Sequence, residues 1–156
     1  MNDRPRQGGR PDSRGSTRPA PPPISADEIQ KILQRGAEEI DRNARDVAQR
    51  CADLSPTQIR NFYGPIVRLR SDVARIQTPQ VRAEHARALY MHSARLAYMA
   101  ARDSRATSLH KCFEQMVRAA VKNNQADNGV VAAICDFAEA LVAYHTQSSK
   151  NKESRR

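Results

Sequence analysis

The stretch from Asp127 to Gln147, "DNGVVAAICDFAEALVAYHTQ", places apolar residues at the three- and four-residue spacing of one helix face. That face carries Val130, Ile134, Phe137, Ala138, Leu141, Val142 and His145. Asp127 or Asn128 has a side-chain oxygen that can cap the first turn, and we expect the helix to end near Gln147. Such a face must be buried, so the stretch predicts a helix packed in a core, with His145 as a core histidine.

Four further helices are expected upstream. The first runs from a capping box at Ser25 and Glu28 to about residue 52, and its apolar positions are sparse. The second begins at a capping box of Ser55 and Gln58, with Pro56 at its first position, and Gly64-Pro65 predicts a kink or a break in it near Phe62 to Pro65. The third begins at Thr78 and Pro79 and runs to about residue 103; the fourth covers about 107 to 123.

The composition agrees with an all-α fold. Aromatic residues make up 4% of the 156 residues and tryptophan is absent, which disfavours strands. We expect a compact bundle of about five helices over residues 24–147. Residues 1–23 are rich in Pro, Gly, Ser and Arg, and residues 148–156 are similarly polar, so both are expected to be disordered basic tails.

Cysteine usage and hydropathy indicate the compartment. Three cysteines without a Cys-x-x-Cys pair signal neither a disulfide framework nor a zinc ribbon. No apolar run approaches the roughly 18 residues of a membrane span, and the N-terminus has no apolar signal-peptide core. These features predict a cytoplasmic protein with no membrane contact.

Positive charge is concentrated on the middle helices. The formal net charge is +9, and residues 54–125 hold 12 basic and 4 acidic side chains. At about 100° per residue, basic residues two turns apart form a stripe on each of three helices. The stripes comprise Arg68 and Arg75; Arg87, Arg95 and Arg102, together with Met91 and Tyr98; and Lys111, Arg118 and Lys122. A single stripe is commonly a solvated helix face, but three together favour contact with a polyanion through its phosphates.

Sequence signals for catalysis and cofactors are weak. An Arg-x4-6-His pattern, found in one class of helical ribonucleases, occurs at Arg87 to His92 and at Arg105 to His110. Two occurrences in so short a chain indicate that the pattern arises easily by chance. His85 and His92 share a helix face without an evident third metal ligand, and the glycines form no phosphate-binding loop. We therefore expect no catalytic residues, no metal site and no cofactor.

Three blocks in order carry a resemblance to a known family. They are "LSPTQIRNFYGPIVRLR" at 54–70, "ARLAYMAARD" at 94–103 and "FAEALVAYHT" at 137–146. Together they resemble the small subunit of the type III-A CRISPR effector (Csm) complex. Gly64-Pro65 and the Arg/Pro-rich N-terminus depart from that pattern.

The resemblance implies a helical, non-catalytic RNA-binding subunit, present in several stacked copies. Its partners would be guide RNA, target RNA, the backbone and other subunits of the complex, and further copies of itself. By position, Arg60, Arg95 and Arg102 are the RNA contacts that the family implies, whereas the other basic residues rest on charge alone. Tyr98 would meet RNA or a neighbouring subunit, and Glu139, Tyr144 and His145 would serve packing or subunit contact. A free-standing helical nucleic-acid-binding dimer is the alternative, and a helical ribonuclease the third.

Overall fold

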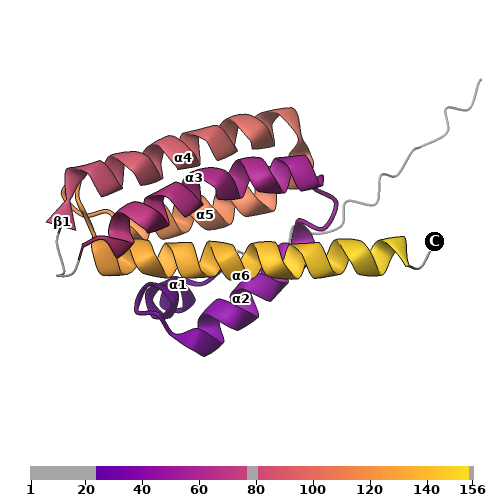
Figure 1. The fold of residues 1–156 in the computed structure, drawn as a ribbon, viewed down its shortest axis with the longest axis horizontal. Helices are drawn as coiled ribbons and strands as arrows, with labels where there is room; N and C mark the ends of the chain where they lie inside the picture. Colours follow the sequence, from indigo (N-terminus) through magenta and orange to yellow (C-terminus); the bar gives the residue numbers. More distant parts are fainter. Residues whose placement is uncertain (1–23, 77–80, 155–156) are drawn as a thin grey trace, which may run out of the picture.

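The computed structural model describes residues 24–76 and 81–154, and six α-helices form nearly all of this part (Figure 1). The helices are α1 (Ala26–Leu33), α2 (Ala37–Arg50), α3 (Pro56–Ala74), α4 (Ala83–Arg102), α5 (Thr107–Ala120) and α6 (Asn128–Glu153), with a 3₁₀ turn, η1, at Ser104–Ala106. The two strands, β1 (Val81–Arg82) and β2 (Ala126–Asp127), have two residues each and pair antiparallel. The all-α prediction is confirmed.

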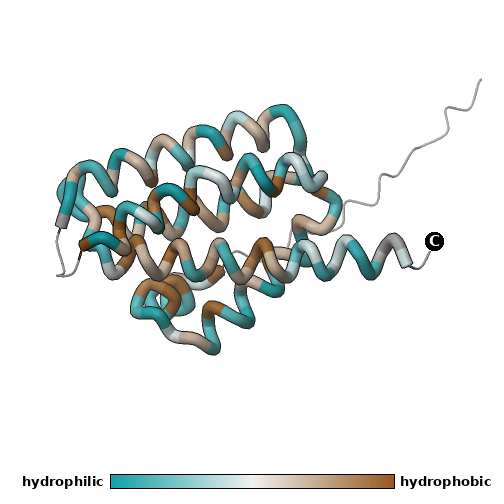
Figure 2. The backbone as a smooth tube through the Cα atoms, viewed as in Figure 1, coloured by the Kyte–Doolittle hydropathy of each residue, from teal (hydrophilic) through white to brown (hydrophobic). Residues whose placement is uncertain are grey.

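Helix α6 is the core helix of the bundle, as its sequence predicted. It packs against α1, α2 and α3 (Figure 1), and residues such as Ile134, Phe137 and Leu141 are fully buried. Its span Asn128–Asn151 is the one helix of the described chain that is long and apolar enough to cross a membrane. Because that apolar face is covered by neighbouring helices, the length and hydropathy of α6 are explained by its place in the core. Teal and brown segments alternate along the helices in Figure 2, as expected when each buries one face.

The first predicted helix is in fact two. The capping box of Ser25 and Glu28 opens α1 as expected, but the chain turns at Arg35, whose φ is 61°, and α2 begins after Gly36. The Arg35 side chain reaches across to Asp136 of α6, with 2.9 Å between Nη2 and Oδ2. The turn lets the apolar faces of both short helices meet α6, so the expectation of one helix over residues 25–52 is wrong.

Helix α3 is unbroken through Gly64-Pro65, so of the predicted kink or break, the break does not occur. Ser55 and Gln58 form the expected capping box, with Pro56 in the first turn. Buried Ile59, Phe62 and Ile66 flank the Gly-Pro pair on both sides. Tertiary packing of this apolar face therefore holds the helix through a residue that removes one internal hydrogen bond.

Two further boundaries differ from the predictions, and one agrees. Helix α4 begins at Ala83, whereas the expected start at Thr78 and Pro79 lies outside the described residues. Helix α5 stops at Ala120, and Asn123 and Asn124 adopt the left-handed conformations that suit the turn after it. The Asp127 side chain accepts a hydrogen bond of 2.7 Å from the Gly129 N–H, as expected for a cap.

The end of α6 also lies further along than predicted. The helix passes the expected end near Gln147 and continues to Glu153, so residues 148–153 are its last turns. The predicted N-terminal tail, residues 1–23, lies outside the described residues.

Candidate nucleic-acid interface

A groove runs between α3 and α4, and two adjoining pockets hollow it. The first, of about 390 Å³, lies toward the start of α3 and the end of α4, and its lining includes Phe62, Leu96 and Met99. The second, of about 440 Å³, continues along the same pair of helices past Pro65 and Ala88. His92 and Arg95 line both pockets, so the two hollows form one surface, which we call the α3–α4 groove.

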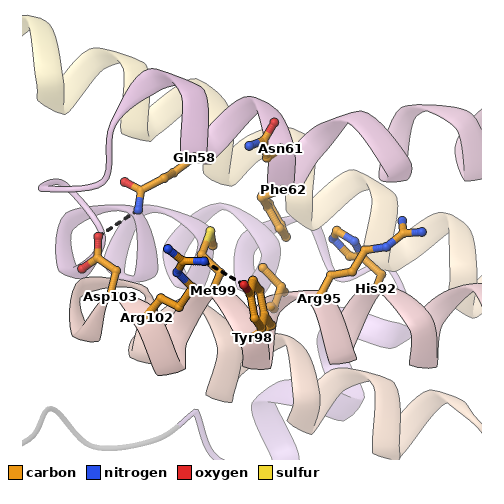
Figure 3. A pocket seen from close by; sticks show the side chains of 10 residues that line it. Gln58, Asn61, Phe62, His92, Arg95, Tyr98, Met99, Arg102 and Asp103 are labelled. Carbon is orange, nitrogen blue, oxygen red and sulfur yellow. Dashed lines mark hydrogen bonds between the residues drawn. The ribbon is translucent and has the colours of Figure 1, made fainter.

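One end of the groove is closed by a hydrogen bond between its two helices. Gln58 Nε2 donates to Asp103 Oδ2 over 2.8 Å (Figure 3), while Gln58 Oε1 accepts from the Ser55 N–H in the capping box. Arg105 also binds Asp103 and reaches the carbonyl oxygen of Asp53. Hydrogen bonds from Arg105 and then Gln58 hold the pKa of Asp103 well below its usual range. Asp103 is therefore an ionised structural link, and its charge is already matched by Arg105.

The floor of the groove is aromatic. The His92 ring lies 5.4 Å from that of Phe62 and 4.9 Å from that of Phe113, measured between centroids. His92 is 3% exposed, and burial, followed by the nearby Arg95 charge, lowers its pKa to about 4. The imidazole is thus neutral at pH 7, which leaves the positive charge of the groove to the arginines.

Basic and aromatic side chains of α4 form the outer edge of the first pocket (Figure 3). Arg102 Nη1 donates a hydrogen bond of 2.8 Å to the Tyr98 hydroxyl, and its guanidinium lies 5.6 Å from the centre of that ring. Tyr98 is 64% exposed and lies one turn from both Arg95 and Arg102, and Met91 is 52% exposed and lies one turn before Arg95. The α4 stripe predicted from sequence is therefore an exposed edge in the structure.

The arginines of the groove differ from most other basic residues in their partners. Within residues 24–76 and 81–154, every arginine of α2 is in an ion pair: Arg42 with Glu28, Arg45 with Asp41 and Arg50 with Asp46. Arg68, Arg95 and Arg102 have no carboxylate partner in the same part of the chain. Positive charge at the groove is thus left uncompensated by the protein itself, which is the arrangement that binds an external anion.

The structure brings only some of the predicted site residues together. Arg68, Arg95, Tyr98 and Arg102 line the α3–α4 groove. Arg60 is exposed but follows Gln58 by two residues, about 200° around the helix, and so faces away from the groove. Arg75 is exposed at the end of α3.

Arg87 lies near the other end of α4, beside a separate hollow of about 460 Å³ that Tyr90 and Met91 also line. The basic residues of the α5 region lie elsewhere again. Arg118 is paired with Glu114 over 2.8 Å, and Lys122 borders a hollow lined by Leu33 of α1 and Val130 of α6. Lys111 is exposed on α5.

Sequence reasoning missed the residues that shape the groove between the arginines. Asn61, Phe62 and Met99 line the first pocket, but no charge or motif marked them as site residues. Gln58 was identified only as a capping residue, although its amide also ties α3 to α4. The sequence signal for these residues was the position of Phe62 on the buried face of α3 and of Leu96 on the buried face of α4. Residues next to a buried face border any groove that runs along that face.

The structure places His92, of the first Arg-x4-6-His pattern, inside the core. His92 is enclosed by phenylalanine rings, and both of its ring nitrogens are without a hydrogen-bond partner. Residues 24–76 and 81–154 contain no cluster of three or more His, Cys, Asp or Glu side chains that could hold a metal ion.

The third sequence block, from α6, makes contacts within the chain. Arg70 of α3 pairs with Glu139 and, over 3.1 Å, with Asp136. The Tyr144 hydroxyl donates to Asp41 of α2, and the Arg45 guanidinium lies 4.7 Å from the Tyr144 ring centre. His145 is 2% exposed. These contacts are packing within the subunit, and a role of the same residues in subunit contact stays a prediction.

Comparison with known proteins gives one match. The family model for Csm2 Type III-A matches residues 34–151, which include α2 to α5 and nearly all of α6. No curated protein and no solved structure matches the chain.

Proposed function

The chain belongs to the Csm2 family of type III-A CRISPR effector complexes, and we propose that within the complex it holds RNA phosphates along the α3–α4 groove. Membership makes it a small subunit of the Csm complex in type III-A CRISPR defence. The RNA contact, its site and the arrangement of copies are our proposals.

A single observation carries the proposal: Arg68, Arg95 and Arg102 surround an open groove and have no carboxylate partner in the described chain. Arginine binds phosphate with its planar fork of N–H donors, and releasing the condensed counterions of RNA adds affinity. Such contacts read no base sequence, which suits a subunit that must accept any guide. In this proposal, the polyanions that bind the groove are the guide RNA and the target RNA paired with it.

We also propose that the chain is non-catalytic and cytoplasmic, with copies that contact one another and the backbone subunits. Val67, Tyr90 and Met91 are 43%, 46% and 52% exposed, and large apolar side chains at such exposure are typical of surfaces that meet another protein. Met91 borders the groove, and Tyr90 lines the separate hollow near the start of α4. Val67 lies on the same side of α3 as Arg60, away from the groove. Neighbouring subunits would therefore cover these side chains while RNA follows the arginines. The helical domain over residues 24–147, extended by the last turns of α6, would act as one unit.

Affinity purification of the complex from its host under RNase-free conditions, followed by ultraviolet crosslinking and peptide mapping, tests the proposal. We expect guide RNAs and other Csm subunits to co-purify, and RNA-crosslinked peptides to come from α3 and α4. Helix α2 is the internal control, because its arginines are already paired with carboxylates. Crosslinks confined to α2 or α5 would contradict the proposed groove, and a lone protein carrying mixed nucleic acid would favour the free-standing binder.

A further inference from the structure

The floor of the α3–α4 groove holds a buried polar group that the proposed phosphate contacts do not use. His92 is 3% exposed, and neither Nδ1 nor Nε2 has a hydrogen-bond partner. Buried polar atoms in folded proteins nearly always have one. Since His92 lines both pockets, its ring borders the groove at the inner wall.

The first pocket has the size and lining of a site for a flat ring. Its volume of about 390 Å³ lies within the roughly 300–1,000 Å³ of small-molecule pockets. Phe62, Leu96 and Met99 supply apolar surface, and the amide groups of Gln58 and Asn61 stand at its α3 side (Figure 3). Apolar walls with a few convergent polar groups are characteristic of sites that bind an aromatic heterocycle.

Charge at the edge of the pocket narrows the choice of ligand. Arg95 and Arg102 line it without a carboxylate partner in the described chain, and the charge of Asp103 is matched by Arg105. A ligand that combines a flat polar ring with a negative charge on either side complements this arrangement. A nucleotide within an RNA strand has that combination.

We propose that the first pocket receives one unstacked base of the bound RNA, an inference that rests on the proposed RNA contact. The base lies against Phe62 and Leu96 and pairs its edge with His92, while Arg95 and Arg102 hold the phosphates on either side. Arg95 lines both pockets together with His92, so the arginine that holds a phosphate borders the same hollow as the imidazole that pairs with the base. Exposed Tyr98 borders the pocket mouth, where its ring can stack on the next base.

The test compares two single-stranded RNAs of equal length and charge, one intact and one with abasic central nucleotides, binding to the full chain. Base–aromatic contact predicts about tenfold tighter binding of the intact RNA. In His92→Phe the aromatic packing is kept but the ring nitrogens are lost, so the intact-to-abasic ratio falls about fivefold, the value of one hydrogen bond. Asn61→Leu removes an amide from the α3 side of the pocket and lowers the preference without touching the core, because Asn61 is exposed. Thermal melting confirms that both variants are folded.

Each outcome is decisive. A preference for intact RNA that both variants reduce, at unchanged salt dependence, supports the base pocket. Equal binding of intact and abasic RNA by the native chain overturns it and leaves the phosphate contact standing. A preference that survives unchanged in either variant also overturns it, because the base then binds without the His92 nitrogens or outside the pocket. Failure to bind either RNA overturns the proposed RNA contact itself.

Discussion

Gln58 and Asp103 are 45 residues apart in the sequence, yet the Gln58 amide donates a hydrogen bond of 2.8 Å to the Asp103 carboxylate. The bond joins the first turn of α3 to the residue that ends α4 and closes the groove at that end. It also places a side chain that caps its own helix in contact with a second helix.

Replacing Gln58 with Glu should weaken this junction. Glu still suits the capping box, but it offers no N–H and adds a carboxylate beside Asp103. Loss of a hydrogen bond to a charged group predicts a fall of about 1–3 kcal/mol in the free energy of unfolding at pH 7, measured by urea denaturation. The loss should shrink toward pH 4, where the facing carboxyls can share a proton. Gln58→Ala is the control, and an equal pH dependence in both variants would count against the explanation.

Replacing Arg95 and Arg102 with Ala should weaken RNA binding to a similar extent for unrelated sequences. Each phosphate contact on single-stranded RNA contributes about 0.7 to the slope of log K against log salt, so two lost contacts lower its magnitude by about 1.4. The matched control is the double variant Arg42→Ala and Arg45→Ala, which removes the same charge from paired residues of α2. Fluorescence anisotropy titrations at several salt concentrations give both quantities. A sequence-selective effect, or an equal loss in the control, would argue against phosphate contacts in the groove.

His92 should make the protein sensitive to mild acid. Its pKa is lowered from 6.5 to about 4 in the folded chain, so between those values the unfolded chain binds the additional proton. The contribution of neutral His92 to the free energy of unfolding is fully present above about pH 6.5. It is lost as the pH falls toward 4, and the free energy of unfolding decreases by about 3 kcal/mol at most. The other charged groups that line the two pockets are Arg68, Arg95, Arg102 and Asp103. The pKa of Asp103 lies below this pH window, so Asp103 does not titrate within it.

His92→Phe should remove that part of the pH dependence while keeping the ring contacts with Phe62 and Phe113. Chemical denaturation at a series of pH values from 4 to 7 measures the difference between the two proteins. Parallel stability curves for the native chain and the variant would show that another group is responsible.

Replacing Pro65 with Ala should stabilise the protein. Pro65 lies inside the continuous helix α3 and cannot donate to the carbonyl oxygen of Asn61, one turn earlier. Proline in a helix interior costs up to about 3 kcal/mol relative to alanine, so we expect a gain of about 1–3 kcal/mol in urea denaturation. An unchanged or lower midpoint would mean that the contact of Pro65 with the groove compensates for the missing hydrogen bond.

The local features of the helices could be read from the sequence because their causes lie within one turn. The capping boxes at Ser25 and Ser55 each join residues three apart, and the apolar face of α6 follows directly from its spacing. The same periodicity correctly placed Arg95 and Arg102 together on an exposed edge. It could not show that Arg60 faces away from them, since that depends on where α4 packs against α3.

What the sequence by itself determined is the helical class, most of the helix starts, the buried faces and the surplus of positive charge on the middle of the chain. Only the tertiary structure decided the turn at Arg35, the continuity of α3 through Pro65, and which arginines lack a carboxylate partner. The pairs that settle these points, such as Arg35 with Asp136, join residues 101 apart. Periodicity and capping act over about four residues, whereas a groove and its uncompensated charge arise only where distant helices meet.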